Sequence, residues 1–316
     1  NLDDFFNAKP VVQEQQAQVT EFRPNPKKGQ NGIYKAIVRF LPNPNDAANK
    51  SILMKYCAYI KDPVSQQTRC LDCPSTVGQP DILQQTFFNL RNSSNPVLQE
   101  NSKQFSRKQQ FASLIQVLTC EADPSLVNKI LVWKYGTKIH DKLMDEMNPP
   151  MGDPRNPFNL LTGRPFSVQV KEVSGFPNYD SCQFFDLAIE QSGMRITTPD
   201  VTGQPTVTVV TANTIATPQG KQLVFDYLKT NAPDTERYEY HEWTAEEQEF
   251  ANKCIQIYSN PQASVQAMAA ANNPAQIQVN QQPQAAQASM QPQVTNFQMP
   301  QMAAPQMAAP QPMQMP

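Results

Sequence analysis

Hydrophobic and polar residues alternate along several short runs of this chain, which is the pattern of β-strands that turn one face toward a core. Residues 33–41 form the strongest run, and it ends at Pro42. Similar runs cover residues 112–118, 130–135 and 166–170. The pattern therefore predicts a mainly β protein.

Helical periodicity is found in fewer places, and it predicts helices within residues 79–103, 137–143, 219–230 and 244–258. The last of these begins with a capping box, in which Thr244 and Glu247 each cap the backbone of the other. The fold class that we expect is mainly β with appended helices.

Composition divides the chain into regions. From Cys254 onward there is no Asp, Glu, Lys or Arg, and Gln, Pro, Ala and Met dominate. Such a segment has little apolar surface to bury, so we expect it to be disordered. The regions predicted are a flexible acidic arm at 1–21, a core at 22–180, an acidic region of strand and helices at 181–258, and a disordered tail at 259–316.

Charge is distributed unevenly along these regions. Residues 22–180 carry 20 Lys and Arg against 13 Asp and Glu, a net charge of +7, whereas residues 1–21 carry −3 and residues 181–253 carry −6. A basic body between acidic segments is typical of a polyanion binder whose own termini compete for the site, although an unrelated protein can show it by chance. We expect the acidic stretch 234–249 to occupy that site or to dock partner proteins.

The available chemistry argues against an enzyme and against a membrane protein. The chain has two histidines, His140 and His241, with no clustered Ser, His and Asp pattern and no glycine loop that could cradle phosphates. No run approaches the roughly 18 apolar residues of a membrane span. Six cysteines without an apolar signal segment do not predict a disulfide framework, so we expect a reducing cytoplasmic compartment.

Aromatic and basic residues gather at and after the run 130–135. Trp133 and Tyr135 share one face of this predicted strand. Two rings suit stacking on bases, and the nearby ammonium groups of Lys134 and Lys138 suit the phosphates of a single strand. The alternative is that both rings fill a core, as most aromatic residues in strands do.

Basic residues near rings recur in three other parts of the chain. The candidate nucleic-acid contacts there are Lys35 and Arg39 in the first strand, Tyr59 in the next, Arg107, Lys108 and Phe111 ahead of the run 112–118, and Lys171, Phe176 and Tyr179 around a turn. For Lys35 and Arg39 the alternative is that they are ordinary solvated residues of a half-exposed strand.

Three cysteines are candidate metal ligands. The spacing of Cys70 and Cys73 lets two thiolates hold one tetrahedral zinc ion, and Cys57 is a candidate third ligand. The fourth ligand is open among Asp72, His140, a more distant cysteine and water. A thiol cluster without metal and a redox role are the alternatives.

In their order along the chain, these segments resemble the T-even bacteriophage single-stranded DNA-binding proteins, the gene 32 helix-destabilising family. The matching stretches are IVRFLPNPND at 37–46, the cysteine region at 57–73, SRKQQF at 106–111, VWKYGTKIHDK at 132–142 and KEVSGFPNYD at 171–180. Three features of the family pattern are missing from this chain: the histidine of the zinc site, the basic N-terminal element and the acidic C-terminal tail.

The resemblance implies an OB-fold barrel with a small zinc-binding cysteine subdomain at about 52–105, and a basic, aromatic cleft between the two. It implies a protein of the host bacterial cytoplasm that coats and protects single-stranded DNA during phage replication, recombination and repair, without sequence specificity or ATP. Implied partners are single-stranded DNA, replication and recombination proteins, and neighbouring copies of the chain. The implied cleft residues are Arg107, Lys108, Phe111, Trp133, Lys134, Lys138, Phe176 and Tyr179. The neutral tail suggests an alternative, a structural or interaction component of a phage particle.

Overall fold

The computed structural model describes residues 20–45 and 51–272. Within these ranges one sheet has nine strands, and a separate pair forms a hairpin. The strands of the sheet are β1 (Glu21–Phe22), β2 (Ile33–Leu41), β3 (Leu53–Lys61), β4 (Thr68–Asp72), β5 (Arg107–Cys120), β6 (Ile130–Tyr135), β7 (Phe166–Val173), β8 (Phe176–Asn178) and β9 (Gln183–Phe184), and those of the hairpin are β10 (Arg195–Pro199) and β11 (Pro205–Val209).

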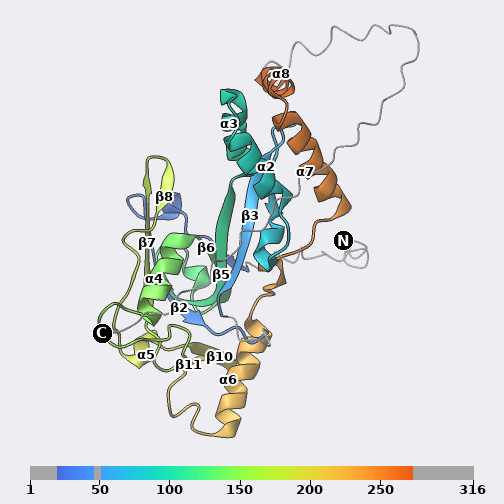
Figure 1. The fold of residues 1–316 in the computed structure, drawn as a ribbon. Helices are drawn as coiled ribbons and strands as arrows, with labels where there is room; N and C mark the ends of the chain where they lie inside the picture. The colour runs from blue at the N-terminus through green and yellow to red at the C-terminus, as the bar shows by residue number, and fades with distance from the viewer. Residues whose placement is uncertain (1–19, 46–50, 273–316) are drawn as a thin grey trace, which may run out of the picture. The chain divides into compact units, whose positions relative to one another are not determined.

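The long strand β5 connects the two parts of the sheet. Its first half pairs antiparallel with β3, from Ala58 opposite Arg107 to Leu53 opposite Ala112. Its second half pairs with β2, which in turn pairs with β7. On the other side β5 pairs with β6, and β4 extends the sheet beyond β3. The face of β3 and β4 therefore continues directly into that of β5 (Figure 1).

The helices are α2 (Ile82–Arg91), α3 (Pro96–Ser102), α4 (Thr137–Met147), α5 (Ile189–Ser192), α6 (Pro218–Asn231), α7 (Ala245–Tyr258) and α8 (Pro261–Asn272). Helix α7 begins with the predicted capping box. The backbone N–H of Glu247 donates to the Thr244 hydroxyl, and the backbone N–H of Thr244 donates to the Glu247 carboxylate. The prediction of a mainly β protein with appended helices is confirmed. None of the helices in the described ranges is long and apolar enough to span a membrane.

Apolar side chains cover both faces of the sheet. One cluster, which includes Phe40 and Trp133, lies among β2, β5, β6, β7 and α4. A second cluster covers the opposite face, where Val132 of β6 packs with Ile196 of β10 and Leu228 of α6. The central strands are thus buried on both sides.

A third cluster joins β3 and β4 to helices from distant parts of the chain. Ile60 and Leu71 of these strands pack with Leu83 of α2 and with Phe250 and Tyr258 of α7. Figure 1 shows α2, α3 and α7 gathered beside β3. Helix α7 is therefore an integral part of this end of the fold.

The predicted disorder of residues 259–316 is wrong for its first part. Helix α8 covers Pro261–Asn272, and Ser264 in it is fully buried, where its hydroxyl accepts from Asn101 Nδ2 at 3.0 Å. The remainder of the predicted tail and residues 1–19 of the predicted arm lie outside the described residues.

Candidate nucleic-acid interface

Trp133 lies in the core of the protein. Its side chain is 1% exposed, and its ring stacks on Phe40 with 6.0 Å between centroids, while Phe22 meets it edge-on at 5.5 Å. A ring enclosed in this way has no free face for a base. The prediction that Trp133 stacks on DNA is wrong, and the alternative of a core residue is confirmed.

Phe111 and Tyr135 belong to the same core. They are 3% and 6% exposed and stack on each other at 6.0 Å, and His140 of α4 stacks on Phe111 at 3.8 Å. The hydroxyl of Tyr135 lies 2.8 Å from that of Ser113. The prediction that these two rings stack on bases is corrected, because their faces are already covered by other rings.

Arg39 is also buried. Its Nη1 donates to Gly163 O at 2.7 Å and to Ser192 O at 2.9 Å, and its Nη2 donates to Asn159 O at 2.8 Å. Burial lowers the pKa of the guanidinium to about 10. The prediction of a phosphate contact is wrong for Arg39, because this side chain holds loop and helix carbonyls against β2.

Four predicted contacts are exposed, and two of them, Lys35 and Lys171, are diagonal neighbours on the paired strands β2 and β7. Lys35 and Lys171 project from β2 and β7, and Phe176, at the β7–β8 turn, is 74% exposed. Arg107 lies over the ring of Tyr56, 4.3 Å from its centroid, and donates to Ser75 and Gln84. These residues remain candidates for contacts at the ends of a bound strand.

The other predicted contacts converge on one hollow of about 740 Å³, which we call the tyrosine hollow. Half-exposed Tyr59 and Tyr179 supply its free rings, and Lys108, Lys134 and Lys138 supply its cations. Its lining residues are Tyr59, Lys108, Gln109, Gln110, Lys134, Tyr135, Gly136, Thr137, Lys138, Ile139, Pro177 and Tyr179. Rings and cations from five elements or their connections thus meet at one surface.

Strand register explains how Tyr59 is placed. Lys108 of β5 lies opposite Cys57 of β3, so its side chain is a diagonal neighbour of Tyr59 on the same face. The Lys108 ammonium lies 5.6 Å from the centroid of the Tyr59 ring, and Gln110 Nε2 donates to the Tyr59 hydroxyl. Burial raises the pKa of Tyr59 and of Tyr179, so both phenols are uncharged at neutral pH.

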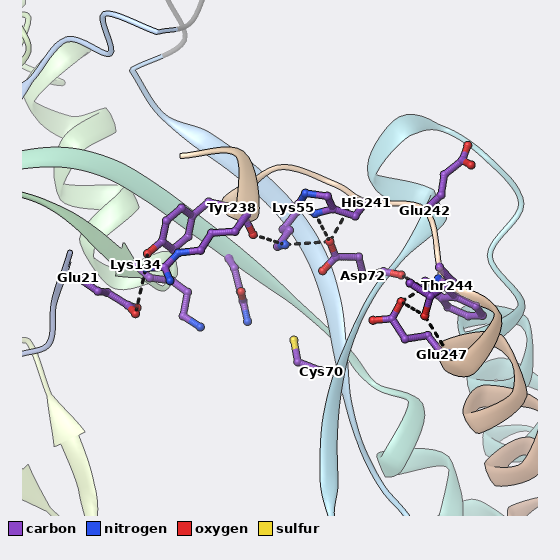
Figure 2. A pocket seen from close by; sticks show the side chains of 13 residues that line it. Glu21, Lys55, Cys70, Asp72, Lys134, Tyr238, His241, Glu242, Thr244 and Glu247 are labelled. Carbon is purple, nitrogen blue, oxygen red and sulfur yellow. Dashed lines mark hydrogen bonds and ion pairs between the residues drawn. The ribbon is translucent and has the colours of Figure 1, made fainter. Parts of the chain in front are cut away.

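A second hollow of about 610 Å³ adjoins the first and shares Gln110 and Lys134 with it. Figure 2 shows its wall, which is formed by β3, β4 and residues 237–247, a segment that we call the strap. We call this cavity the strap hollow, and its lining residues are Glu21, Lys55, Cys70, Asp72, Gln110, Lys134, Arg237, Tyr238, His241, Glu242, Trp243, Thr244 and Glu247.

Polar contacts hold the strap on β3 and β4. Lys55 Nζ lies 2.8 Å from Asp72 Oδ2 and donates to the carbonyls of Arg237 and Glu239 at 3.0 Å each. Trp243 Nε1 donates to Asp72 O at 2.6 Å. Part of the predicted acidic region 234–249 therefore lies beside the tyrosine hollow and shares a wall with it.

Sequence reasoning did not select Lys55 and Gln110, which the structure places in these hollows. A signal for Lys55 was present, because it shares a strand face with Cys57 and Tyr59 at a spacing of two. Gln110 similarly shares a face with Lys108. Following the alternation across neighbouring strands would have found both residues.

The three predicted zinc ligands do not converge. Cys70 and Cys57 lie on the same face of β4 and β3, and the neighbouring Cys57 thiol lowers the pKa of Cys70 to about 7. Cys73 is an odd number of residues farther on, so it turns to the other face, where it packs with Leu83 in the third cluster. In the described ranges no three His, Cys, Asp or Glu side chains are arranged to hold a metal ion. The residues present therefore do not fit the zinc site that the resemblance implied.

Comparison with known proteins finds one matching family and two similar phage proteins. A family profile described as gp32 DNA binding protein like matches residues 30–199. Two relatives, each named single-stranded DNA-binding protein and found in Enterobacteria phages T4 and T2, are 28% identical over 163 residues. The aligned part is 49% of this chain and 52% or 51% of theirs, so the chain spans about half the length of the curated relatives it matches.

Proposed function

The chain belongs to the gp32 DNA binding protein like family, and from this premise we propose that it binds single-stranded DNA in the tyrosine hollow without reading its sequence. In this proposal it coats and protects single-stranded DNA during phage replication, recombination and repair in the host bacterial cytoplasm, and it uses no ATP. The names of its relatives support a binding protein rather than an enzyme.

The observation that carries the proposal is the composition of the tyrosine hollow. Tyr59 and Tyr179 offer partly free rings, on which bases stack with about 1 to 3 kcal/mol each. Lys108, Lys134 and Lys138 line the same surface and can neutralise consecutive phosphates. Because every base has a flat face and every nucleotide a phosphate, such a site tolerates any sequence.

Selectivity for single strands follows from the same contacts. Paired bases in a duplex are stacked on one another and cannot offer their faces to Tyr59 and Tyr179. A protein that binds only the unpaired strand stabilises it by mass action. The free energy of binding alone would therefore let the chain melt weak hairpins and keep a template single-stranded.

We extend the proposal to the architecture that holds the site. Strands β2, β5, β6 and β7 surround the cluster that contains Phe40 and Trp133, with α4 against it, and this arrangement supports an OB-type barrel. Strands β3 and β4 with α2 and α3 form the smaller subdomain near residues 52–105. In the proposal, the strand of DNA follows the junction between these two parts, and neighbouring copies bind side by side along it.

The acidic region 234–249 is proposed to regulate access or to dock replication partners. Its exposed Glu242 lines the strap hollow, which shares Lys134 with the tyrosine hollow. A carboxylate at this place repels phosphates that approach Lys134 and is accessible to a basic partner.

Equilibrium binding of fluorescently labelled oligo(dT) tests the proposed site. We expect Tyr59→Ala to weaken binding by about 1 to 3 kcal/mol, which is roughly 5- to 150-fold, because one stacking platform is lost. Lys134→Gln should reduce the salt slope by about 0.7, the value for one phosphate contact on a single strand. Lys229→Gln, an exposed position on α6 outside both hollows, is the matched control and should leave both values unchanged.

A duplex of mixed sequence is the second ligand in this experiment. The proposal expects its affinity to be far below that of oligo(dT) at the same salt concentration. Equal affinity for the two ligands, or an unchanged affinity in Tyr59→Ala, would remove the tyrosine hollow as the binding site.

A further inference from the structure

A carboxylate already occupies the rim of the tyrosine hollow. Asp180 Oδ1 lies 2.5 Å from Nζ of Lys138, one of the lysines that line this hollow. Lys142, one turn farther along α4, donates from Nζ to the backbone oxygen of Asp180 at 3.4 Å. Two lysines of one helix are therefore directed at a single acidic residue, which directly follows Tyr179.

Asp180 is held in this position by Asn178. The side-chain amide of Asn178 donates to Asp180 Oδ2 at 2.7 Å, and the backbone N–H of Asp180 donates back to Asn178 Oδ1 at 3.0 Å. The hydrogen bond from Lys138, with that from Asn178, lowers the pKa of Asp180. Each carboxylate oxygen thus has its own donor, and the group is charged at neutral pH.

The donors around this carboxylate are those that a phosphate of a DNA backbone would use. The Lys138 ammonium and the Asn178 amide donate to its two oxygens, and the Lys142 ammonium donates to the backbone oxygen of the same residue, so all three can turn to an oxyanion of similar size. The Asp180 side chain is 62% exposed and that of Lys138 61%, so both are accessible to a strand that lies over Tyr179. An exposed ion pair of this kind is weak and can exchange with another anion.

We propose that Lys138, Lys142 and Asn178 form a phosphate subsite on the path of the DNA strand, and that Asp180 is a resident anion which a backbone phosphate displaces. This inference rests on the proposed function, because it assumes that the strand passes through the tyrosine hollow. Asp180 then lowers the affinity for single-stranded DNA, because the strand must break the Lys138–Asp180 ion pair before it gains the phosphate contact. It also makes exchange of the strand easier.

Asp180→Asn in the full chain separates this role from others, since the amide keeps the shape of the side chain and loses its charge. We expect binding to oligo(dT) at low salt to become about two- to fivefold tighter, the range of an exposed ion pair. The salt slope should increase by about 0.7, because the phosphate contact then forms without releasing a carboxylate that takes up a cation from solution. Asp226→Asn on α6, outside both hollows, makes the same change in net charge and should have little effect.

The double replacement Lys138→Gln with Lys142→Gln provides the second half of the test. In this background Asp180→Asn should no longer tighten binding, because Lys138, which the Asp180 carboxylate masks, and the neighbouring Lys142 are both absent. A gain of the same size in this background would assign the effect to the general field of the protein and overturn the subsite. Asp180→Ser, which is shorter, should tighten binding in the same direction as Asp180→Asn.

Other outcomes distinguish the inference from the proposed function. If the wild-type chain binds oligo(dT) and Asp180→Asn leaves affinity and salt slope unchanged, the subsite is overturned and the proposed function stands. If Asp180→Asn and Asp180→Ser both weaken binding and lower the melting temperature, Asp180 is a structural residue and the inference is again overturned. Failure of the wild-type chain to bind oligo(dT) would overturn both.

Discussion

Arg39 carries a positive charge into the interior beside β2, and in the described part of the chain no carboxylate pairs with it. Burying a charge is costly unless its hydrogen bonds are made. Three backbone carbonyls, from Asn159, Gly163 and Ser192, offset much of this cost, and only Nε lacks a partner. Arg39 therefore ties the segment around residues 159–163 and the end of α5 to the central sheet.

Replacement of Arg39 by Met tests this structural role. The three carbonyls would lose their donors inside the protein, so we expect the free energy of unfolding to fall by about 3 kcal/mol or more. Urea denaturation measures the change. Lys35→Met, an exposed position on the same strand, should change it by less than about 0.5 kcal/mol. Loss of oligo(dT) binding by Arg39→Met at unchanged stability would instead return Arg39 to the interface.

Among the elements, the strap combines well-defined contacts to the sheet with a proposed role in regulating access to the site. Lys55 and Trp243 fix it to β3 and β4, and the helix that follows it contributes Phe250 and Tyr258 to the third apolar cluster. Deleting everything after Asn231 would expose that cluster, so a loss of DNA binding could not be distinguished from a loss of folding. Point substitutions in the strap are therefore the better test of its charge.

Neutralising the strap should raise the affinity for single-stranded DNA. Glu239 and Glu242 are exposed strap residues, and Glu242 lines the strap hollow, so Glu239→Gln with Glu242→Gln removes two strap charges with little effect on packing. We expect tighter binding to oligo(dT) at low salt and a difference that vanishes at high salt, because screening weakens the repulsion. The control is Glu190→Gln with Asp226→Asn, which makes the same charge change outside both hollows. Equal binding by the strap variant and the wild type would leave the strap a structural element.

For the molecule as a whole, the question is whether zinc is needed to hold together β3, β4 and the helices that pack on them. Apolar contacts supply its core, since Leu71 and Cys73 pack with Leu83 of α2 and Phe250 of α7. A structural zinc site contributes on the order of 10 kcal/mol to folding. Because β3 and β4 have their own apolar cluster and their cysteines diverge, we expect this part of the fold to be stable without such a contribution.

Metal analysis and a chelator test this view of the whole protein. We expect purified chain to contain well below one zinc ion per molecule, and EDTA to leave both the melting temperature and the oligo(dT) affinity unchanged. The physical reason is that Cys73 lies on the opposite face from Cys57 and Cys70. Stoichiometric zinc whose removal lowers the melting temperature would show that these cysteines converge after all.

Much of the local structure could be predicted from the sequence. Trp133 and Tyr135 share a face, as the alternation predicted, and both belong to one cluster. The capping box of α7 formed because its two residues are neighbours in the chain. Among the predicted contacts, Tyr59, Lys108, Lys134, Tyr135, Lys138 and Tyr179 line the tyrosine hollow, although the Tyr135 ring is itself buried.

Only the tertiary structure decided which strand faces are covered and which charges meet. An alternating pattern separates two faces but does not say which one is solvated, and β6 is covered on both sides, so Trp133 became a core residue. Pairing between distant segments is equally invisible in a single sequence: Lys138 of α4 and Asp180, just after β8, are separated by 42 positions and meet only in the folded chain. Periodicity and capping depend on neighbouring residues, whereas burial and ion pairing depend on how the whole chain packs.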